Sequence, residues 1–126
     1  MRSVLDTSVL VAGLEHELPG ELAISAASLA ELHFGVLVAS DATVRAERLR
    51  RLTFLHQEFE AIPVDHRVAA SYGQLAAAVV SAGRTARSRS MDLIIAATAH
   101  AHGARLVTRN TRDLAGIGDL VEIVEL

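Results

Sequence analysis

The chain has 126 residues, of which 51% are hydrophobic and 3% aromatic, and its formal net charge is −3. A length within the usual range of about 100 to 200 residues predicts one domain, and the apolar content can fill a core made of Ala, Val, Leu and Ile. The absence of cysteine excludes disulfides, zinc–thiolate sites and cysteine nucleophiles, and because all 12 basic residues are arginine, lysine-dependent chemistry is excluded as well.

The N-terminus predicts a short buried strand that runs directly into a helix. Arg2 to Leu5 has the apolar character of a strand, and VLVAGL at residues 9–14 suits the first turns of a helix. Asp6 stands between the two, at the carboxyl end of the strand, which is where open α/β sheets bind ligands. The alternative is that Asp6 or Thr7 only caps the following helix.

A polar turn at Glu15 to Glu21 separates this unit from a second strand and helix. Leu22 to Ser25 is the second strand candidate, and Ser28 is the expected N-cap of the helix that follows. Glu31 comes three residues after Ser28, which matches the capping-box pattern. Glu31 is therefore interpreted either as a helix cap or as part of a functional site.

Two longer helices flank a third strand in the middle of the chain. The first is predicted from Asp41 to Glu60, the strand at Ala61 to Val64, and the second helix from His66 to Ala82 with Asp65 as its cap. The first helix interleaves apolar positions with four arginines: Arg45, Arg48, Arg50 and Arg51. These arginines form either a solvated face or a patch that follows phosphates.

The polar stretch RTARSRS after Gly83 has no large apolar side chain and predicts an exposed, mobile loop. Its arginines are either solvated or in contact with phosphates. The loop leads into Met91 to His102, a helix that is apolar on nearly every side and must therefore be buried. Asp92 lies in the first turn of this helix, and Gly103 offers the left-handed position at which helices commonly end.

The C-terminal part predicts a strand at Arg105 to Thr108, a polar turn that ends in Asp113, and a final edge strand in VEIVEL, residues 121–126. Strand and helix signals alternate throughout, which favours an α/β fold with a mostly parallel sheet of about five short strands and helices on both faces. Crossovers are expected to be right-handed. We treat residues 1–126 as one domain.

Four acids from four segments are expected at one edge of this sheet: Asp6, Glu31, Asp92 and Asp113. Two carboxylates about 4 Å apart repel by roughly 4 kcal/mol at an effective dielectric of about 20, so the group needs a counter-charge. An all-oxygen cluster favours Mg²⁺ or Mn²⁺ over zinc. Neutral oxygens and donors nearby would support it: Thr7, Ser8, Thr108 and Asn110. Such clusters recur in enzymes that hydrolyse phosphodiesters.

Three segments carry a family resemblance: VLDTSVLVA, SAASLAELHFG and MDLIIAATAHAHGARLVTRNTRD. Together they resemble the successive motifs of PIN-domain ribonucleases, and the chain is most similar to the VapC-type toxins of type II toxin–antitoxin modules. The resemblance runs from Val4 to Val124, in order and at family-like spacing. One departure is Leu114, where the family often has an aromatic residue, and this concerns packing rather than chemistry.

The resemblance implies a PIN-like three-layer α/β/α sandwich and an endoribonuclease that depends on Mg²⁺ or Mn²⁺. The family's acids match Asp6, Glu31, Asp92 and Asp113, with Asn110 and Thr7 (or Ser8) in support. Asp6 and Asp92 would be the principal metal ligands, and Glu31 would be a ligand or would position a metal-bound water. Asp113 would complete the site, directly or through a neighbour, or serve a second ion. Other expectations are RNA as substrate (tRNA or another structured RNA), a small VapB-like antitoxin and a homodimer. RNA phosphates would meet five arginines: Arg84, Arg87, Arg89, Arg109 and Arg112.

Other classes fit less well. A haloacid-dehalogenase-type phosphatase needs a second Asp at position 8, which is Ser8, and it also needs a lysine, as a receiver domain does. His100 and His102 are interpreted as covering a helix end rather than as metal ligands. An RNA- or partner-binding domain with little or no catalysis stays open as the alternative function. Without a signal peptide or an apolar run of about 20 residues, the sequence predicts a cytoplasmic protein with no membrane segment.

Overall fold

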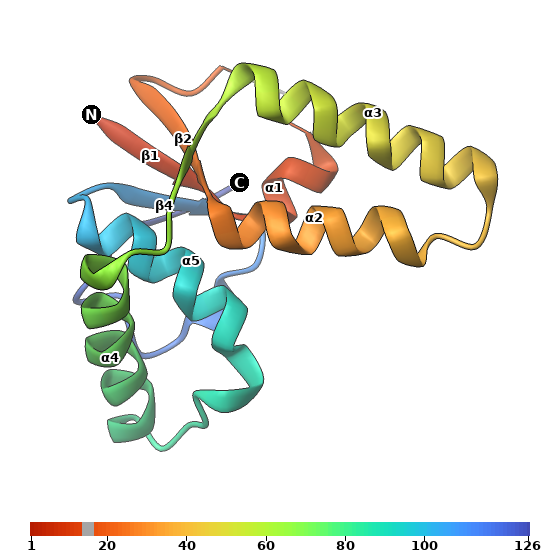
Figure 1. Cartoon of the computed structure of the whole chain (residues 1–126). Coiled ribbons are helices and arrows are strands. Elements are labelled where there is room, and N and C mark those ends of the chain that lie inside the picture. The colour runs from red at the N-terminus through yellow and green to blue at the C-terminus, as the bar shows by residue number, and fades with distance from the viewer. Residues whose placement is uncertain (14–16) are drawn as a thin grey trace.

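The computed structural model describes residues 1–13 and 17–126, so the end of the predicted first helix and the start of the turn at Glu15 lie outside the described residues. The structure is an α/β sandwich around a five-stranded sheet (Figure 1). Its elements are, in order, β1 (Arg2–Leu5), α1 (Thr7–Ala12), β2 (Glu21–Ser25), α2 (Ala26–Val38), α3 (Ala42–Glu58), β3 (Glu60–Ile62), α4 (His66–Ser81), the 3-10 helix η1 (Arg87–Arg89), α5 (Ser90–Ala101), β4 (Arg105–Thr108), the 3-10 helix η2 (Thr111–Leu114) and β5 (Ile123–Glu125).

The sheet is parallel throughout, in the order β3-β2-β1-β4-β5. In the central register, Leu5 of β1 lies opposite Ile24 of β2 and Val107 of β4. The α/β class, the parallel sheet and the edge position of the last strand are thereby confirmed. Because every strand runs the same way, the carboxyl ends of β1, β2 and β4 meet at one edge of the sheet.

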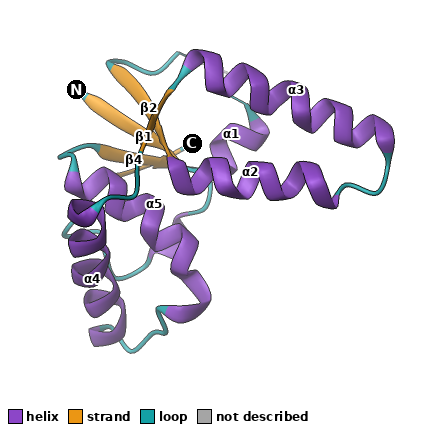
Figure 2. Cartoon of the chain, in the orientation of Figure 1, coloured by secondary structure: helices purple, strands orange, loops and turns teal. Residues whose placement is uncertain are grey.

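Helices cover both faces of the sheet (Figure 2). Side chains of a strand alternate between faces, and β1 shows this directly: Val4 belongs to the core cluster under α4 and α5, and Leu5 to the cluster under α1 and α3. Both side chains are fully buried. A sheet covered on both faces explains why these strands are nearly continuous in apolar residues.

Helix α5 is the most deeply buried helix segment, between the sheet and α4. Six of its residues have no exposed surface: Leu93, Ile95, Ala96, Ala97, Thr98 and Ala99. The helix ends as predicted, since Gly103 takes a positive φ of 60° just after it. Small alanines along α5 let α4 and β1 approach closely, and the packing fixes the position of the first turn.

The capping-box prediction for α2 is wrong. The helix begins directly after β2, with Ser25 as its N-cap, whose hydroxyl accepts a hydrogen bond from the Ala27 N–H at 3.1 Å. Ser28 therefore lies inside the helix and is fully buried, and Glu31 lies in the second turn. Glu31 thus has no role in capping this helix.

The predicted Asp65 cap is confirmed, whereas Asp41, predicted as the first residue of its helix, is the N-cap of α3. Asp41 accepts from the backbone N–H groups of α3, and Asp65 does the same for α4. The third strand, β3, begins one residue earlier and ends two residues earlier than predicted. The arginines of α3 are exposed, and two of them bind the end of α2: Arg45 donates to the Ala39 carbonyl at 2.8 Å and Arg48 to the Gly35 carbonyl at 2.6 Å.

The prediction of a simple exposed loop before α5 is wrong for its second half, where η1 forms and Arg89 becomes partly buried. Within the described ranges, no helix combines the length and apolar character needed to cross a membrane.

We expect Ile95→Ala to lower the free energy of unfolding by about 2–4 kcal/mol, because it opens a cavity in a fully buried part of α5. Urea unfolding followed by circular dichroism measures this change. Leu37→Ala is the matched control, since Leu37 is 75% exposed and its truncation should change stability by less than about 0.5 kcal/mol. Equal losses in the two variants would contradict the burial of α5.

Candidate active site

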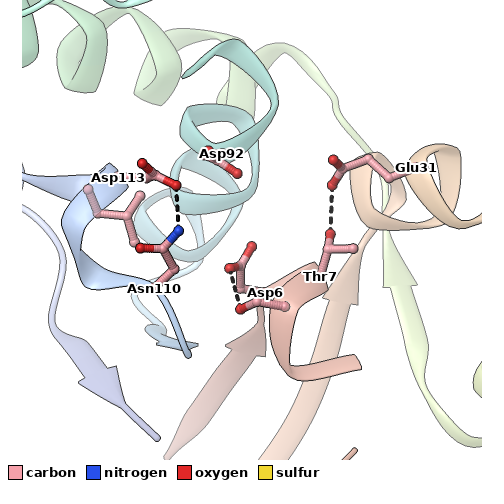
Figure 3. A pocket seen from close by; sticks show the side chains of 8 residues that line it. Asp6, Thr7, Glu31, Asp92, Asn110 and Asp113 are labelled. Atoms are coloured by element: carbon pink, nitrogen blue, oxygen red, sulfur yellow. Dashed lines mark hydrogen bonds between the residues drawn. The ribbon is translucent and has the colours of Figure 1, made fainter. Parts of the chain in front are cut away.

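A cavity of about 200 Å³ opens at the carboxyl edge of the sheet, and we call it the acid pocket (Figure 3). All four predicted acids line it, from four separate segments of the chain. Its lining residues are Asp6, Thr7, Ser8, Glu31, Asp92, Asn110, Asp113 and Leu114. The structure therefore brings together the acids that the sequence pattern placed at this edge.

Asp6 is held by hydroxyl groups from both sides. It is 9% exposed, and its Oδ2 accepts hydrogen bonds from Ser8 Oγ and Thr108 Oγ1, both at 2.8 Å. These hydroxyls are themselves oriented, because Ser8 Oγ accepts from the Arg109 N–H and Thr108 Oγ1 from the Asn110 N–H, both at 3.1 Å. Asp6 occupies the N-cap position of α1 without a side-chain capping bond, so the simple cap interpretation does not describe its carboxylate.

Glu31 reaches the pocket from α2 and is bound to α1. Its Oε1 accepts a hydrogen bond from Thr7 Oγ1 at 2.6 Å, and the same hydroxyl lies 3.0 Å from Ser28 Oγ. Glu31 and Thr7 face Asp92 and Asp113 across the pocket (Figure 3). Thr7 thus positions an acid and is one of the supporting residues predicted from the sequence.

Asp92 carries the clearest electrostatic signature of the site. Burial in the first turn of α5, together with the negative charges of Asp6, Asp113 and Glu31, raises the pKa of its carboxyl group to about 6, against an opposing effect of Arg89. A carboxylate with such a pKa lacks sufficient positive charge around it. The acids therefore act on one another electrostatically, even though they come from distant segments.

Asp113 differs from the other acids because both of its oxygens have partners. Oδ1 accepts from Arg89 Nη1 at 2.7 Å in an ion pair, and Oδ2 accepts from Asn110 Nδ2 at 2.6 Å. Arg89 immediately precedes α5, so it joins η1 to the acid pocket. The sequence predicted Arg89 only as an RNA contact and missed its pairing with Asp113. Its position three residues before Asp92 was the only local signal.

The donor set of the pocket fits a hard divalent cation, because it offers only carboxylate, hydroxyl and amide oxygens. The raised pKa of Asp92 shows the same need for positive charge. In the present side-chain positions, no group of three or more His, Asp or Glu residues is arranged to hold an ion, within residues 1–13 and 17–126. Metal binding would therefore require the acids to move toward one another.

The remaining predicted residues lie outside the acid pocket. Arg84, Arg87, Arg109 and Arg112 are exposed, and Arg84, in the loop before η1, donates to the Arg112 carbonyl of η2 at 3.4 Å. His100 binds Ser71 of α4, with Nδ1 and Oγ 2.8 Å apart, and neither it nor His102 lines the pocket.

Comparison with known proteins identifies the family to which the chain belongs. The PIN domain family model matches residues 3–120. Ribonuclease VapC5 of Mycobacterium tuberculosis is 35% identical over 85% of this chain and 82% of its own length, and Ribonuclease VapC4 of the same organism is 36% identical over 99% and 97%.

Solved structures show the same relationship. A crystal structure of VapBC-5, a toxin–antitoxin system of M. tuberculosis, contains a chain with a TM-score of 0.88 and 34% identity, over 99% of this chain and 98% of that one. VapBC2 from Rickettsia felis, bound to a DNA fragment from its promoter, has a TM-score of 0.82 at 24% identity and full coverage of this chain (100%, with 99% of its own), and it supports the fold alone.

We expect the stability of the cation-free protein to fall as the pH rises from about 4 to about 6. The folded state holds the Asp92 proton up to a pH of about 6, whereas the unfolded chain releases it near 3.8, so ionisation penalises only the folded state. Urea titrations in EDTA at several pH values measure this effect against Asp92→Asn, which should lack it. At pH 8 the variant should be more stable than the unmodified protein by on the order of 1 kcal/mol, after allowance for solvent screening.

The control for this experiment is Asp119→Asn, because Asp119 is exposed and lies outside the pocket. It should keep the pH dependence of the unmodified protein. A pH profile that is the same in Asp92→Asn and in the unmodified protein would contradict the electrostatic coupling of the acids.

Proposed function

Because the chain belongs to the PIN-domain family and is of the VapC type, we propose that it is an endoribonuclease that hydrolyses RNA phosphodiester bonds at the acid pocket with Mg²⁺ or Mn²⁺. The observation that carries this proposal is the convergence of Asp6, Glu31, Asp92 and Asp113 on one cavity. Their mutual repulsion, expressed in the pKa of Asp92, is a free-energy cost that a stable fold would avoid unless the site needed the charge.

The metal would be held mainly by Asp6 and Asp92, with Glu31 as a further ligand or as an anchor for a bound water. A divalent cation there would neutralise the carboxylates and supply the Lewis acidity that phosphodiester hydrolysis needs. The chain itself prepares two of these groups. Both hydroxyls on Asp6 bind Oδ2, which leaves Oδ1 for the cation, and Thr7 fixes the direction of the Glu31 carboxylate.

Arg89 and Asp113 would act as a unit at the side of the pocket formed by η1 and η2. Arg89 donates one guanidinium N–H to Asp113. Because an arginine has five N–H donors, the other N–H groups could bind a phosphate oxygen. The pair would thus hold the RNA backbone near the acids. The Arg89 guanidinium would also offset the negative charge of Asp113, which would otherwise repel the RNA phosphates. Arg84, Arg87, Arg109 and Arg112 would extend this contact along the RNA.

The proposed partners follow from the relatives. Several solved structures similar to this chain are complexes of VapBC toxin–antitoxin systems. By analogy, a small VapB-like antitoxin would bind this chain and inhibit it, and two copies would form a homodimer. The alternative function, an RNA- or partner-binding domain with little or no catalysis, differs in one measurable respect, which is turnover of RNA in the presence of divalent cations.

Purified protein, freed of any antitoxin, should cleave RNA in Mg²⁺ or Mn²⁺ and stop in EDTA. Asp6→Asn and Asp92→Asn should each reduce kcat by roughly 100-fold or more, because each removes a charged ligand. Gel analysis of total RNA and of a tRNA pool measures cleavage, and sequencing the new ends identifies the cut site. Asp119→Asn is the control and should keep full activity, because Asp119 does not line the acid pocket.

Two results would contradict the proposal in different ways. Full activity in a folded Asp92→Asn variant would refute the metal-site assignment. If no RNA is cleaved with any divalent cation while RNA or a protein partner still binds, the non-catalytic alternative holds.

Asp113→Asn should reduce kcat less than Asp92→Asn does, because both Asp113 oxygens are already engaged by Arg89 and Asn110. Asparagine keeps one oxygen for Arg89, so the pair is weakened rather than lost. Parallel kcat measurements at saturating Mn²⁺ test this order. A larger loss in Asp113→Asn would show that Asp113 binds the cation directly and that Arg89 must release it.

A further inference from the structure

A second cavity, of about 290 Å³, adjoins the acid pocket and is lined by residues of α1, α2 and α3. These three helices lie together in Figure 1. Thr7 and Glu31 line both cavities, so the hydrogen-bonded pair that they form is the wall between them. We call this second cavity the arginine hollow, because Arg48 and Arg51 of α3 line it. A molecule that passes over the acid pocket in this direction enters the hollow next.

The two arginines supply positive charge close to the acids. Arg48 is held in place, since its Nη1 donates to the Gly35 carbonyl at 2.6 Å, and its other N–H groups stay available. Within the described part of the chain, neither Arg48 nor Arg51 forms a salt bridge. The guanidinium group is the side chain best suited to a phosphate, because its fork of donors matches two phosphate oxygens.

The floor of the hollow is apolar and suits the less polar parts of a nucleotide. Val11 of α1 is 49% exposed there, beside Leu32 and Gly35 of α2. A cation pair above an apolar floor can receive a phosphate and a ribose or base together.

We propose that the arginine hollow is a second RNA subsite, in which Arg48 and Arg51 bind the backbone phosphate of a nucleotide that flanks the cleaved bond. This inference rests on the proposed ribonuclease function and deepens it. The chain has a net charge of −3 and four carboxylates line its acid pocket, so positive groups on both sides of the pocket would offset the repulsion of RNA phosphates. Arg89 and its neighbours serve one side, and the arginine hollow serves the other.

The test measures the binding of a fluorescent 12-nucleotide single-stranded RNA by anisotropy, at low salt and in EDTA so that no cleavage occurs. The variants are Arg51→Gln and the double variant Arg48→Gln/Arg51→Gln. The matched control is Arg50→Gln, which removes the same charge from the same helix but does not line the hollow. The double variant loses the Arg48 bond to Gly35, which could loosen the packing of α2 against α3, and thermal unfolding measures any such loss of stability. Arg51→Gln keeps this bond and therefore tests the subsite independently.

The double variant should raise Kd roughly 10-fold and make the salt dependence shallower by about 0.7 on the log–log scale, because the two arginines together contact one phosphate. Arg51→Gln should show about half of this slope change, and Arg50→Gln none. In cleavage assays with Mn²⁺, KM should rise while kcat stays within about two-fold, because the hollow binds RNA away from the reacting atoms.

The outcomes separate this inference from the proposed function. If the unmodified protein cleaves RNA and the Arg48 and Arg51 variants behave like Arg50→Gln, the second subsite is refuted while the ribonuclease stands. If no RNA is cleaved but the binding pattern holds, the subsite stands without catalysis. If the double variant keeps its RNA affinity and loses binding to the proposed VapB-like antitoxin, the hollow belongs to a protein partner and the inference is overturned.

Discussion

Repulsion among carboxylates at one edge of a parallel sheet is the constraint on which the rest of the structure depends. Asp92 shows it most clearly, with a pKa raised to about 6 by burial and by three other acids. Only a rigid frame can hold charges together against this force, and the buried helix α5 supplies it. The alanine-rich packing of α5 between β1 and α4 is therefore as much a part of the site as the acids are.

The fold relieves this repulsion with different partners at each acid. Asp6 is bound by hydroxyls that follow β1 and end β4, Glu31 by a hydroxyl of α1, and Asp113 by a guanidinium and an amide. Asp92 has only burial and the field of Arg89. It is thus the group whose charge is least compensated, and the cation that we propose would bind beside it. Positive side chains lie on either side of the acid pocket: Arg89 on one side, and Arg48 with Arg51 on the other.

The features of the fold that could be predicted from the sequence are those that local patterns control. Apolar runs and their end residues placed the strands, and a carboxylate after a strand is enough to place Asp6 at the edge of the sheet. Sequence-based prediction failed where two residues could both cap a helix, or where a side chain pairs with a residue distant in the sequence. Ser25 and Ser28 can both cap a helix, and the end of β2 decides for Ser25. The pairing of Arg89 with Asp113 spans 24 residues and two 3-10 segments, and no periodicity encodes it. The same holds for the arginine hollow, where three helices must meet first.

The bond between Asp6 and Thr108 joins residues that are 102 positions apart. During synthesis, Asp6 leaves the ribosome early and stays without its second hydroxyl until β4 has emerged and paired with β1. Every shorter nascent chain lacks Asn110 and Asp113 as well. A ribonuclease of this fold would thus be inactive while it is still attached to the ribosome. Its activity would begin only when the central strand β1 has paired with both β2 and β4.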